Sequence, residues 1–488
     1  MSHTAREARE SSRRVSPRHL RIHEKSQDTQ IQPIDLRNPG DSWMRRRANG
    51  KELRERAPRE IHAGWKPAKD RPDPLELIEQ SNVGRQKELI PLRMGRMAQS
   101  PFAFLRGAAG VMDWDLAKTP SSGIDVVICG DAHLNNFGFY GTPQRDVVFD
   151  LNDFDEAAIG PWEWDLKRLT ASVNVAAREN GLNKQERRAS VMRCVDGYRF
   201  NLNRLQSMGV LDVWYLHAYP GRDNPLIKID PKSRAVLKKT LALAQTQTNN
   251  TLLLKTAERR VDGSWHLVHN PPVLTPVSDE IKNKVIESLH AYADTLTRER
   301  RYMLNRYHIV DVAHRVVGVG SVGTRAYLVL LFGNSDDDAL FLQVKEAGIP
   351  ASGPYLPALP NEYAHQGKRV VTGQRALQAS SDVMLGWTSI DKRPFYVRQM
   401  KNMKASIPVE WLTGPSFNFY ARGCGAILAR AHARTGDAAM LAGYCGASDA
   451  LDQALADWAE AYGDQTEKDH ARLVSAIAKG QIKAIEGL

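Results

Sequence analysis

The sequence predicts an α+β protein with two lobes, one large and helical and one small and built of antiparallel β-strands. A chain of 488 residues is long enough to bury two substantial hydrophobic cores. Most of it shows apolar residues at helical spacing, whereas residues 311–404 are rich in β-branched residues separated by Gly and Asn-Asp turns. Its 42% hydrophobic and 25% charged residues are typical of a globular protein.

Four segments are expected along the chain. Residues 1–70 form a basic, flexible N-terminal segment, and residues 71–310 form the helical lobe that carries the chemistry-bearing loops. Residues 311–404 form the β-rich lobe, and residues 405–488 are helices that complete the helical lobe.

The net charge of +11 is concentrated near the N-terminus. Residues 1–60 hold 15 Lys and Arg against 9 Asp and Glu, which accounts for six of the eleven net charges. The same residues are poor in large apolar side chains, which favours a flexible tail. Basic tails can bind nucleic acid, but no nucleic-acid motif accompanies this one. We therefore expect a solvated tail and no nucleic-acid partner.

Apolar runs and cysteines indicate the compartment. No apolar run approaches the roughly 18–20 residues of a membrane span, and no export signal begins the chain, so no membrane partner is expected. The cysteines lie far apart without metal-ligand spacing, which predicts reduced thiols in a cytoplasmic protein. They are Cys129, Cys194, Cys424 and Cys445.

Caps and apolar stripes predict the elements before residue 180. Ser100 is suited to cap a helix that begins at Pro101, because serine accepts backbone N–H groups and proline fits the first helical turn. The β-branched run 124–128 delivers the chain to Gly130 and Asp131. The expected order is a helix over 75–98, a helix from 101 to the turn at 119–123, strands over 124–128 and 147–149, and a helix from Asp165.

Residues 180–300 are expected to be mostly helical. From Val316 the pattern changes to three β-strands, the first two joined by a glycine-rich turn and the last two by a hairpin turn at Asn334–Asp338. A helical segment near 365–384 precedes a strand over 395–400, and the rest of the chain is helical.

The first motif is CGDAHLNN, which places Asn136 five residues after Asp131. Three aspartates follow an apolar run shortly afterwards: Asp150, Asp153 and Asp155. Phosphoryl transfer needs a carboxylate to orient the attacking hydroxyl and oxygen ligands to hold Mg²⁺, and kinases supply both from such a loop and strand end. An Asx-rich turn is the simpler alternative, but it does not explain the second aspartate cluster. For His133 we expect a structural role in orienting the loop.

The second motif is Gly318-Val-Gly320-Ser321-Val-Gly323, a match to GxGxxG. A dinucleotide-binding turn would be followed by a helix, whereas TRAYLVLLF favours a strand. A kinase glycine loop joins two antiparallel strands, and the next strand carries a lysine for the phosphates. Lys345 lies at the end of that next apolar run. The alternative is a hairpin with a surface lysine.

These motifs resemble those of aminoglycoside and choline phosphotransferases. GDAHLNN resembles their catalytic loop, and NDFDEAAIGPWEWDL resembles their second motif, in which a metal-binding aspartate precedes a helix-starting Asp-Leu by twelve positions. The resemblance implies that Asp131 is the catalytic base and that Asn136 and Asp153 bind Mg²⁺. It also implies that Asp165 is a buried aspartate that braces the catalytic loop.

From about residue 75 the whole chain is similar to a bacterial family, domain of unknown function 2252. The blocks that carry the similarity are SPFAFLRG, CGDAHLNNFG, FDLNDFDE, GPWEWDLKRL and YVRQMKNMK. This similarity implies no particular acceptor.

The sequence departs from ordinary kinases in three ways. Cys129 replaces the histidine before Gly-Asp, and no glutamate is obvious as the partner of Lys345, for which Glu362 and Gln374 are the candidates. The catalytic loop also precedes the glycine loop, so a circularly permuted kinase-like fold is expected, which surface termini permit. We therefore expect Lys345 to lie across a cleft from Asp153.

The predicted function is transfer of the γ-phosphoryl group of Mg²⁺-ATP to a hydroxyl of a small-molecule or protein acceptor. Lys345 and the glycine loop would position the phosphates, and the backbone near Gln399 and Met400 would contact adenine. Two alternatives stay open: a nucleotide-binding pseudokinase or regulatory module, and transfer of AMP from ATP bound in the reversed direction.

Overall fold

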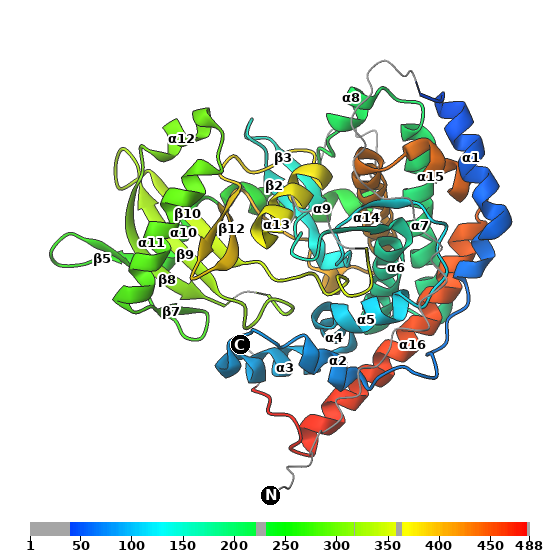
Figure 1. Cartoon of the computed structure of the whole chain (residues 1–488), viewed down its shortest axis with the longest axis horizontal. Helices are drawn as coiled ribbons and strands as arrows, with labels where there is room; N and C mark the ends of the chain where they lie inside the picture. The colour runs from blue at the N-terminus through cyan, green and yellow to red at the C-terminus, as the bar shows by residue number, and fades with distance from the viewer. Residues whose placement is uncertain (1–39, 221–230, 317, 358–363, 486–488) are drawn as a thin grey trace, which may run out of the picture. The chain divides into compact units, whose positions relative to one another are not determined.

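The computed structural model describes residues 40–220, 231–316, 318–357 and 364–485. Asp41–Leu488 form one compact unit, drawn in Figure 1. Helices and a six-stranded antiparallel sheet come largely from different stretches of the chain, so the expected α+β class is confirmed. The first 39 residues of the predicted N-terminal segment lie outside the described residues.

Helices make up most of the unit, with more breaks than expected. The helix expected over 75–98 is two helices, α2 (Pro74–Gln80) and α3 (Ile90–Ala98). The helix expected from residue 101 is interrupted at Ala108. Next to this break, Arg93 donates a hydrogen bond of 2.7 Å to the carbonyl oxygen of Gly107. The helices are α1 (Trp43–Arg56), α2 (Pro74–Gln80), α3 (Ile90–Ala98), α4 (Pro101–Gly107), α5 (Ala109–Leu116), α6 (Trp162–Glu179), α7 (Lys184–Leu205), α8 (Val210–Trp214), α9 (Pro231–Thr246), α10 (Asn249–Thr256), α11 (Asp279–Asp294), α12 (Arg298–Leu304), α13 (Gln366–Leu377), α14 (Gly414–Thr435), α15 (Ala438–Cys445) and α16 (Ala450–Ala478).

The main hydrophobic core lies among α6, α7, α14 and α16. Close packing follows from small residues, since a Cβ added at Gly425 of α14 would lie 2.0 Å from the carbonyl oxygen of Cys194 in α7. Large aromatic side chains fill the remaining space, with Trp162 stacked on Tyr198 at a ring distance of 5.5 Å. Almost every residue of α6 is buried, so this helix is a rigid base for the loops before it.

The β-strands form one large sheet and three small ones. In the large sheet the order is β11-β12-β10-β9-β8-β7, with every neighbouring pair antiparallel. The first strand of the β-rich segment ends at Arg315 instead of beginning at Val316, because the alternating run 308–315 pairs with β9. The strands are β1 (Asp125–Ile128), β2 (Phe137–Gly141), β3 (Val147–Leu151), β4 (Ala158–Pro161), β5 (Ala257–Arg259), β6 (Trp265–Leu267), β7 (Leu274–Pro276), β8 (His308–Arg315), β9 (Ala326–Phe332), β10 (Ala339–Glu346), β11 (Gly386–Ile390) and β12 (Arg393–Gln399).

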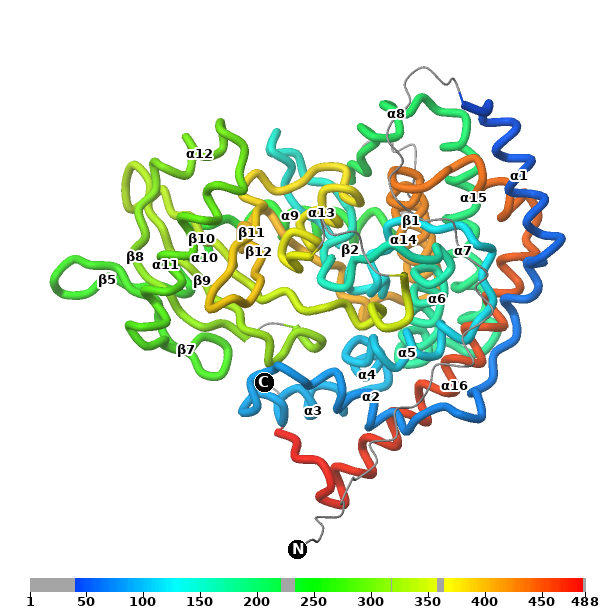
Figure 2. Tube along the Cα trace, viewed as in Figure 1, coloured from blue at the N-terminus to red at the C-terminus, as the bar shows by residue number. Residues whose placement is uncertain are grey.

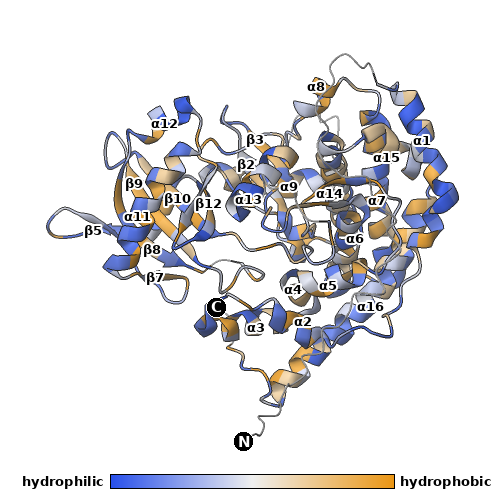
Figure 3. Ribbon diagram, viewed as in Figure 1, coloured by the Kyte–Doolittle hydropathy of each residue, from blue (hydrophilic) through white to orange (hydrophobic). Residues whose placement is uncertain are grey.

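The two faces of the large sheet have different partners. Leu342 and Val344 of β10 pack in one core with residues of α11, and Phe341 packs in another with Leu252 and Leu253 of α10. Because side chains alternate along a strand, Lys345 shares the face of Phe341. Figure 3 shows β9 and β10 as hydrophobic along most of their length, as expected of strands buried on both faces.

Short strands occur where helices were expected, within 180–300. β5 and β6 pair with each other, and the N–H of Leu267 donates to Asp311 of β8 at 2.9 Å. These contacts join segments far apart in sequence, so local helical spacing does not reveal them. None of the described helices combines the length and apolar composition that a membrane span needs. The four cysteines are buried and unpaired by disulfides.

Candidate functional site

Two pairs of strands bring the Asp131 loop and the aspartate cluster together. β1 leads into the Asp131 loop, and its partner β4 begins shortly after the cluster. The hairpin β2–β3 lies between them, and its ends are tied by a bond of 2.9 Å from the N–H of Asn152 to the carbonyl oxygen of Asn136. Figure 2 shows this cyan hairpin near the yellow α13, and Tyr140 of β2 donates to the carbonyl oxygen of Ser380 just beyond that helix at 2.8 Å.

Asp165, in the first turn of α6, is bonded to the loop that carries Asp131. Its carboxylate accepts the backbone N–H groups of Cys129 at 2.8 Å and Gly130 at 2.9 Å. His432 of α14 lies 3.2 Å from the same carboxylate. Gly130 has a φ of 76°, and a Cβ there would lie 2.1 Å from the carbonyl oxygen of Glu156, so only glycine fits.

Arg168 and His133 flank Asp131. Nε of Arg168 donates to Oδ1 of Asp131 at 2.6 Å, and Nε2 of His133 lies 3.6 Å from Oδ2. Burial raises the pKa of Asp131, while the charge of Arg168 lowers it. Burial, with the charges of Arg106 and Arg168, holds the pKa of His133 well below its usual range, so its imidazole is neutral. The Asp131 side chain is 20% exposed, which leaves it one accessible side.

Asn136 is turned toward the same loop. Its Nδ2 donates to the backbone oxygen of Asp131 at 2.7 Å. The side chain is buried, and its orientation leaves Oδ1 as the atom that could meet a cation.

Lys345 reaches the aspartate cluster from the large sheet. Its ammonium forms an ion pair with Oδ2 of Asp155, across 190 positions of sequence, and its side chain is 3% exposed. Burial disfavours the charged lysine, but the Asp155 carboxylate outweighs this and the pKa of Lys345 is raised. Burial and the charge of Asp155 raise the pKa of Asp153. Oδ1 of Asp155 is buried with no hydrogen-bond partner among the described residues.

Arg398 of β12 joins this group; it lies in the YVRQMKNMK block but was not predicted as a site residue. Its Nη1 donates to the carbonyl oxygen of Asn152 at 3.2 Å and its Nε to Oε1 of Gln343 at 3.1 Å. Gln343 lies two residues before Lys345 on the same face of β10. Polar and charged side chains therefore cover this end of the sheet.

Asp150, the first aspartate of the cluster, points elsewhere. Its Oδ1 pairs with Arg430 of α14 and accepts the N–H of Leu151 at 2.8 Å. Its Oδ2 accepts the N–H of Ala379 at 2.9 Å. Both Asp150 and Arg430 are buried, so this aspartate is part of the core.

The glycine loop joins the adjacent antiparallel strands β8 and β9. Lys345 of β10 pairs with Ala326, the first residue of β9 after the loop. Gly318 and Gly323 have φ of 65° and 89°. The loop carbonyls face residues before α4, since Arg85 donates to Val322 at 2.6 Å and the N–H of Gln86 donates to Gly323 at 2.8 Å. Ser321 and Gly320 lie at the middle of this loop, both partly exposed.

Gln399 and Met400 use their backbone N–H groups within the fold. The N–H of Gln399 donates to Asp382 at 2.6 Å, and that of Met400 donates to Phe341 at 2.8 Å. These donors are therefore unavailable to a ligand in this conformation. Of the two candidate partners of Lys345, Gln374 donates to Gln378 at 2.8 Å, and Glu362 lies outside the described residues.

A group of cations lies between the end of β8 and the segment after β12; we name Arg315, Lys401 and Lys404 the basic cluster. Burial and then the charges of Arg315 and Lys255 lower the pKa of Lys401. Burial and then the charge of Arg398 lower the pKa of Lys404 to about 7, with Lys401 also contributing. Nε of Arg315 is buried without a hydrogen-bond partner among the described residues.

The donor atoms near Asp153 fit a magnesium–nucleotide complex better than a bare metal site. In the described part of the chain, no group of three or more His, Cys, Asp or Glu side chains is arranged to hold a metal ion. Mg²⁺ bound with a nucleotide needs only one or two carboxylates, because phosphates and waters complete its shell. Asp153, the unbonded Oδ1 of Asp155 and the amide group of Asn136 carry oxygens of this chemical kind.

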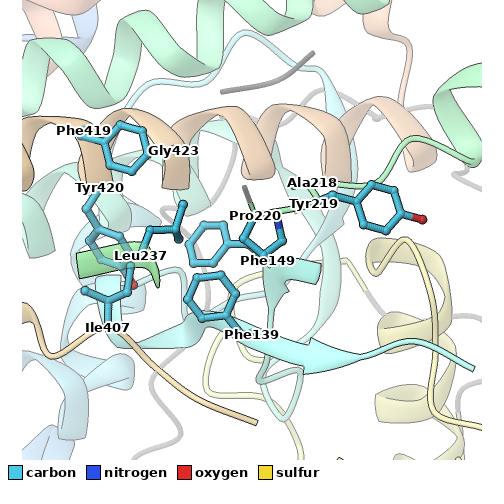
Figure 4. Close-up of a pocket in the computed structure, with 10 residues that line it drawn as sticks. All are labelled: Phe139, Phe149, Ala218, Tyr219, Pro220, Leu237, Ile407, Phe419, Tyr420 and Gly423. Carbon is cyan, nitrogen blue, oxygen red and sulfur yellow. The ribbon is translucent and has the colours of Figure 1, made fainter. Parts of the chain in front are cut away.

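An apolar pocket lies against Phe139 of β2 and Phe149 of β3, shown in Figure 4. It has about 380 Å³ of empty space, part of it open to solvent. No predicted site residue lines it. The lining residues are Phe139, Phe149, Ala218, Tyr219, Pro220, Leu237, Ile407, Phe419, Tyr420 and Gly423.

Comparison with known proteins gives one match. Neither the curated proteins nor the solved structures include a match to this chain. A family model described as "Uncharacterized protein conserved in bacteria (DUF2252)" matches residues 85–476, a stretch that holds Asp131, Asp153, the glycine loop and Lys345. The chain therefore belongs to this bacterial family.

Proposed function

We propose that the protein is an ATP-dependent phosphotransferase that acts on a hydroxyl group. The observation that carries this proposal is the ion pair between Lys345 and Asp155, which joins β10, the second strand after the glycine loop, to the aspartate cluster that follows β3. Neither motif set can catalyse phosphoryl transfer alone. In kinases a lysine and a glycine loop hold the phosphates, whereas aspartates hold the metal and the acceptor. Their contact favours one site over two unrelated motifs.

In the proposed reaction the acceptor oxygen attacks the γ-phosphorus, the bond between that phosphorus and the β–γ bridging oxygen breaks, and ADP leaves. Asp131 accepts the hydroxyl proton, held in position by Arg168. His133, neutral beside it, keeps the loop in place. Asp153, Asp155 and Asn136 would hold Mg²⁺, which neutralises phosphate charge. Lys345 would exchange Asp155 for a phosphate oxygen.

The arrangement supports a circularly permuted kinase-like fold. A glycine loop between antiparallel strands, followed by a lysine on the third strand, matches the kinase order within the sheet. The Asp131 loop precedes this sheet in the chain instead of following it. One difference from kinases lies two residues before the lysine of β10. Kinases have alanine at this position, as in V-A-I-K, whereas this chain has Gln343.

AMP transfer is a second candidate, favoured by the basic cluster. Adenine is held by apolar walls and backbone bonds, but Gln399 and Met400 offer no free N–H. Lys401 follows them directly, and its charge interacts with those of Arg315 and Lys404. Cations suit phosphates, so ATP bound in the reversed direction would place its β- and γ-phosphates there. The acceptor oxygen would then attack the α-phosphorus, and pyrophosphate would leave.

Labelled ATP distinguishes these reactions. Purified protein is incubated with Mg²⁺, a small-molecule extract or a protein extract, and ATP labelled at either the α- or the γ-phosphorus. Label from γ-ATP in an acceptor supports phosphoryl transfer, and label from α-ATP with released pyrophosphate supports AMP transfer. The Asp131→Asn variant should give neither. Stabilisation by Mg²⁺-ATP without transfer would favour a regulatory nucleotide-binding module, and no stabilisation at millimolar nucleotide would refute the nucleotide site.

A further inference from the structure

Arg106 is held rigidly beside the Asp131 loop. It lies in the last turn of α4, a helix capped by Ser100, whose Oγ accepts the N–H of Ala103 at 3.1 Å. The carbonyls on both sides of Arg106 are fixed, because Arg168 donates to Leu105 at 3.1 Å and Arg93 donates to Gly107 at 2.7 Å. The start of the Arg106 side chain is therefore preorganised.

The guanidinium of Arg106 lies on the Asp131 side of the site. Its Cζ is 5.9 Å from the centre of the Phe102 ring, and that ring is 6.4 Å from the ring of His133. His133 in turn lies 3.6 Å from Asp131. The backbone oxygen of Arg106 also lies 3.3 Å from the position of a Cβ on Gly320, so the residue lies next to the glycine loop.

Among the described residues Arg106 has a ring partner, Phe102, but no carboxylate that pairs with it. Its Nε is buried without a hydrogen bond. The nearby arginines differ, since Arg168 is bonded to Asp131 and Arg93 to Asn82. A half-buried guanidinium without a paired carboxylate is costly, and an anion from solution would satisfy it.

Three carboxylates act on the charge of Arg106: those of Asp131, Glu410 and Glu179. Asp131 thus has two cations nearby, Arg168 and Arg106, and only the first is bonded to it. Because Asp131 is already bonded to Arg168, Arg106 is the cation of this pair that has no directly bonded carboxylate.

We propose that Arg106 binds an anionic oxygen group of the acceptor, a carboxylate or a phosphate, and thereby presents its hydroxyl to Asp131. The acceptor is accordingly a hydroxyl-bearing anionic small molecule, or a protein hydroxyl that lies beside an acidic or phosphorylated side chain. This proposal rests on the proposed role of Asp131 and holds for phosphoryl or AMP transfer alike. Arg106 contacts the substrate through two parallel N–H···O bonds that a lysine cannot reproduce.

The first test uses inorganic phosphate as the probe. Full-length protein is saturated with Mg²⁺ and a non-hydrolysable ATP analogue, and phosphate is then titrated by calorimetry and thermal melting. Wild type should bind phosphate and gain stability. Arg106→Gln should lose about 10- to 150-fold in phosphate affinity, Arg106→Lys should lose less, and Arg422→Gln, an arginine paired with Asp196 elsewhere, should match wild type.

Two results would overturn the proposal: no phosphate binding by wild type, or equal binding by Arg106→Gln. If the proposed nucleotide site is wrong, the ATP analogue will not raise the melting temperature of the protein, and this result is separate from the phosphate titration. Phosphate titrations of nucleotide-free wild type and Arg106→Gln then still decide the role of Arg106.

The second test examines the acceptor itself. Labelled products are purified by anion exchange and their acceptor is identified by mass spectrometry. An acceptor that carries a carboxylate or phosphate besides the transferred group supports the proposal, and an acceptor without either overturns it. With the purified acceptor, Arg106→Gln should raise KM far more than it lowers kcat.

Discussion

Asp150 and Asp155 lie five residues apart in one segment, yet their surroundings differ completely. Both oxygens of Asp150 are engaged by groups of the fold, among them Arg430, and the side chain is 2% exposed. Asp155 is 24% exposed, pairs with Lys345 through one oxygen and leaves the other unbonded. Both form one ion pair with a distant cation, so the ion pair alone does not separate their roles.

The difference lies in how many bonding positions the fold fills. A buried carboxylate whose oxygens are all satisfied contributes to specifying the core, whereas an unbonded oxygen next to a partly exposed ion pair can accept a metal or exchange partners. The same contrast separates Arg168, which is bonded to Asp131, from Arg106, which is not. At Asp155 the unfilled position is a carboxylate oxygen, whereas in the Asp150 pair the unbonded atoms are Nε and Nη1 of Arg430.

The largest expected effect is on catalysis. Asp131→Asn removes the proton acceptor but keeps the size of the side chain, so transfer should fall about 10²- to 10⁴-fold. Stabilisation by Mg²⁺-ATP should be unchanged, because a base acts in the transition state and not in nucleotide binding. Single-turnover transfer and thermal melting measure the two quantities. A parallel loss of binding would contradict the assigned role.

The next largest effect is on stability, and a matched pair of substitutions tests the comparison directly. Asp150→Asn turns an amide nitrogen toward existing N–H donors and leaves Arg430 without its counter-charge, so the free energy of unfolding should fall by about 3–5 kcal/mol. Asp155→Asn can still accept from Lys345, whose charge Asp153 also opposes, so a smaller loss of about 1–2 kcal/mol is expected. Urea unfolding measures both. Equal losses of unfolding free energy in the two variants would show that Asp150 and Asp155 do not differ in their structural roles.

A smaller effect is expected on nucleotide binding. Asp153→Ala removes an oxygen ligand of the proposed magnesium, so the affinity for Mg²⁺-ATP should fall about tenfold, while the affinity for ATP with EDTA changes little. Isothermal calorimetry with and without Mg²⁺ makes the measurement. Glu410→Gln, an exposed carboxylate outside the cluster, serves as control. Unchanged Mg²⁺ dependence in Asp153→Ala would remove Asp153 from the metal site.

The smallest effect concerns pH. Burial and Arg398 lower the pKa of Lys404 from an ordinary 10.5 to about 7, so between these values the unfolded chain holds a proton that the folded chain has released. Stability should therefore rise with pH across this window. Binding of tripolyphosphate should change in the opposite direction and weaken as pH rises through about 7, because Lys404 loses its charge. Lys404→Arg should bind with a flatter pH profile, and an identical profile would exclude Lys404 from phosphate binding.

Much of the local structure could be predicted from sequence. The Ser100 cap, the strand before Gly130 and the helix from Asp165 depend on residues close in the chain, and the structure has elements at these places. The prediction of one continuous helix over 75–98 was wrong, and the strands β5 to β7 were not predicted. Those short strands exist because of partners elsewhere, such as Asp311, which accepts the N–H of Leu267.

The sequence by itself determined the family, the mixed α+β composition and the residue types at the candidate site, because these depend on local patterns and motif spacing. Only the tertiary structure decided the pairing of charges. Arg168 was available to any nearby carboxylate, and Lys345 could have faced solvent. Which cation meets which aspartate depends on how buried helices and strands pack, and those contacts span 37 positions for Arg168 with Asp131, 190 for Lys345 with Asp155 and 280 for Arg430 with Asp150. Burial then fixes the choice, since a charge removed from water must find a partner that the same packing brings within reach.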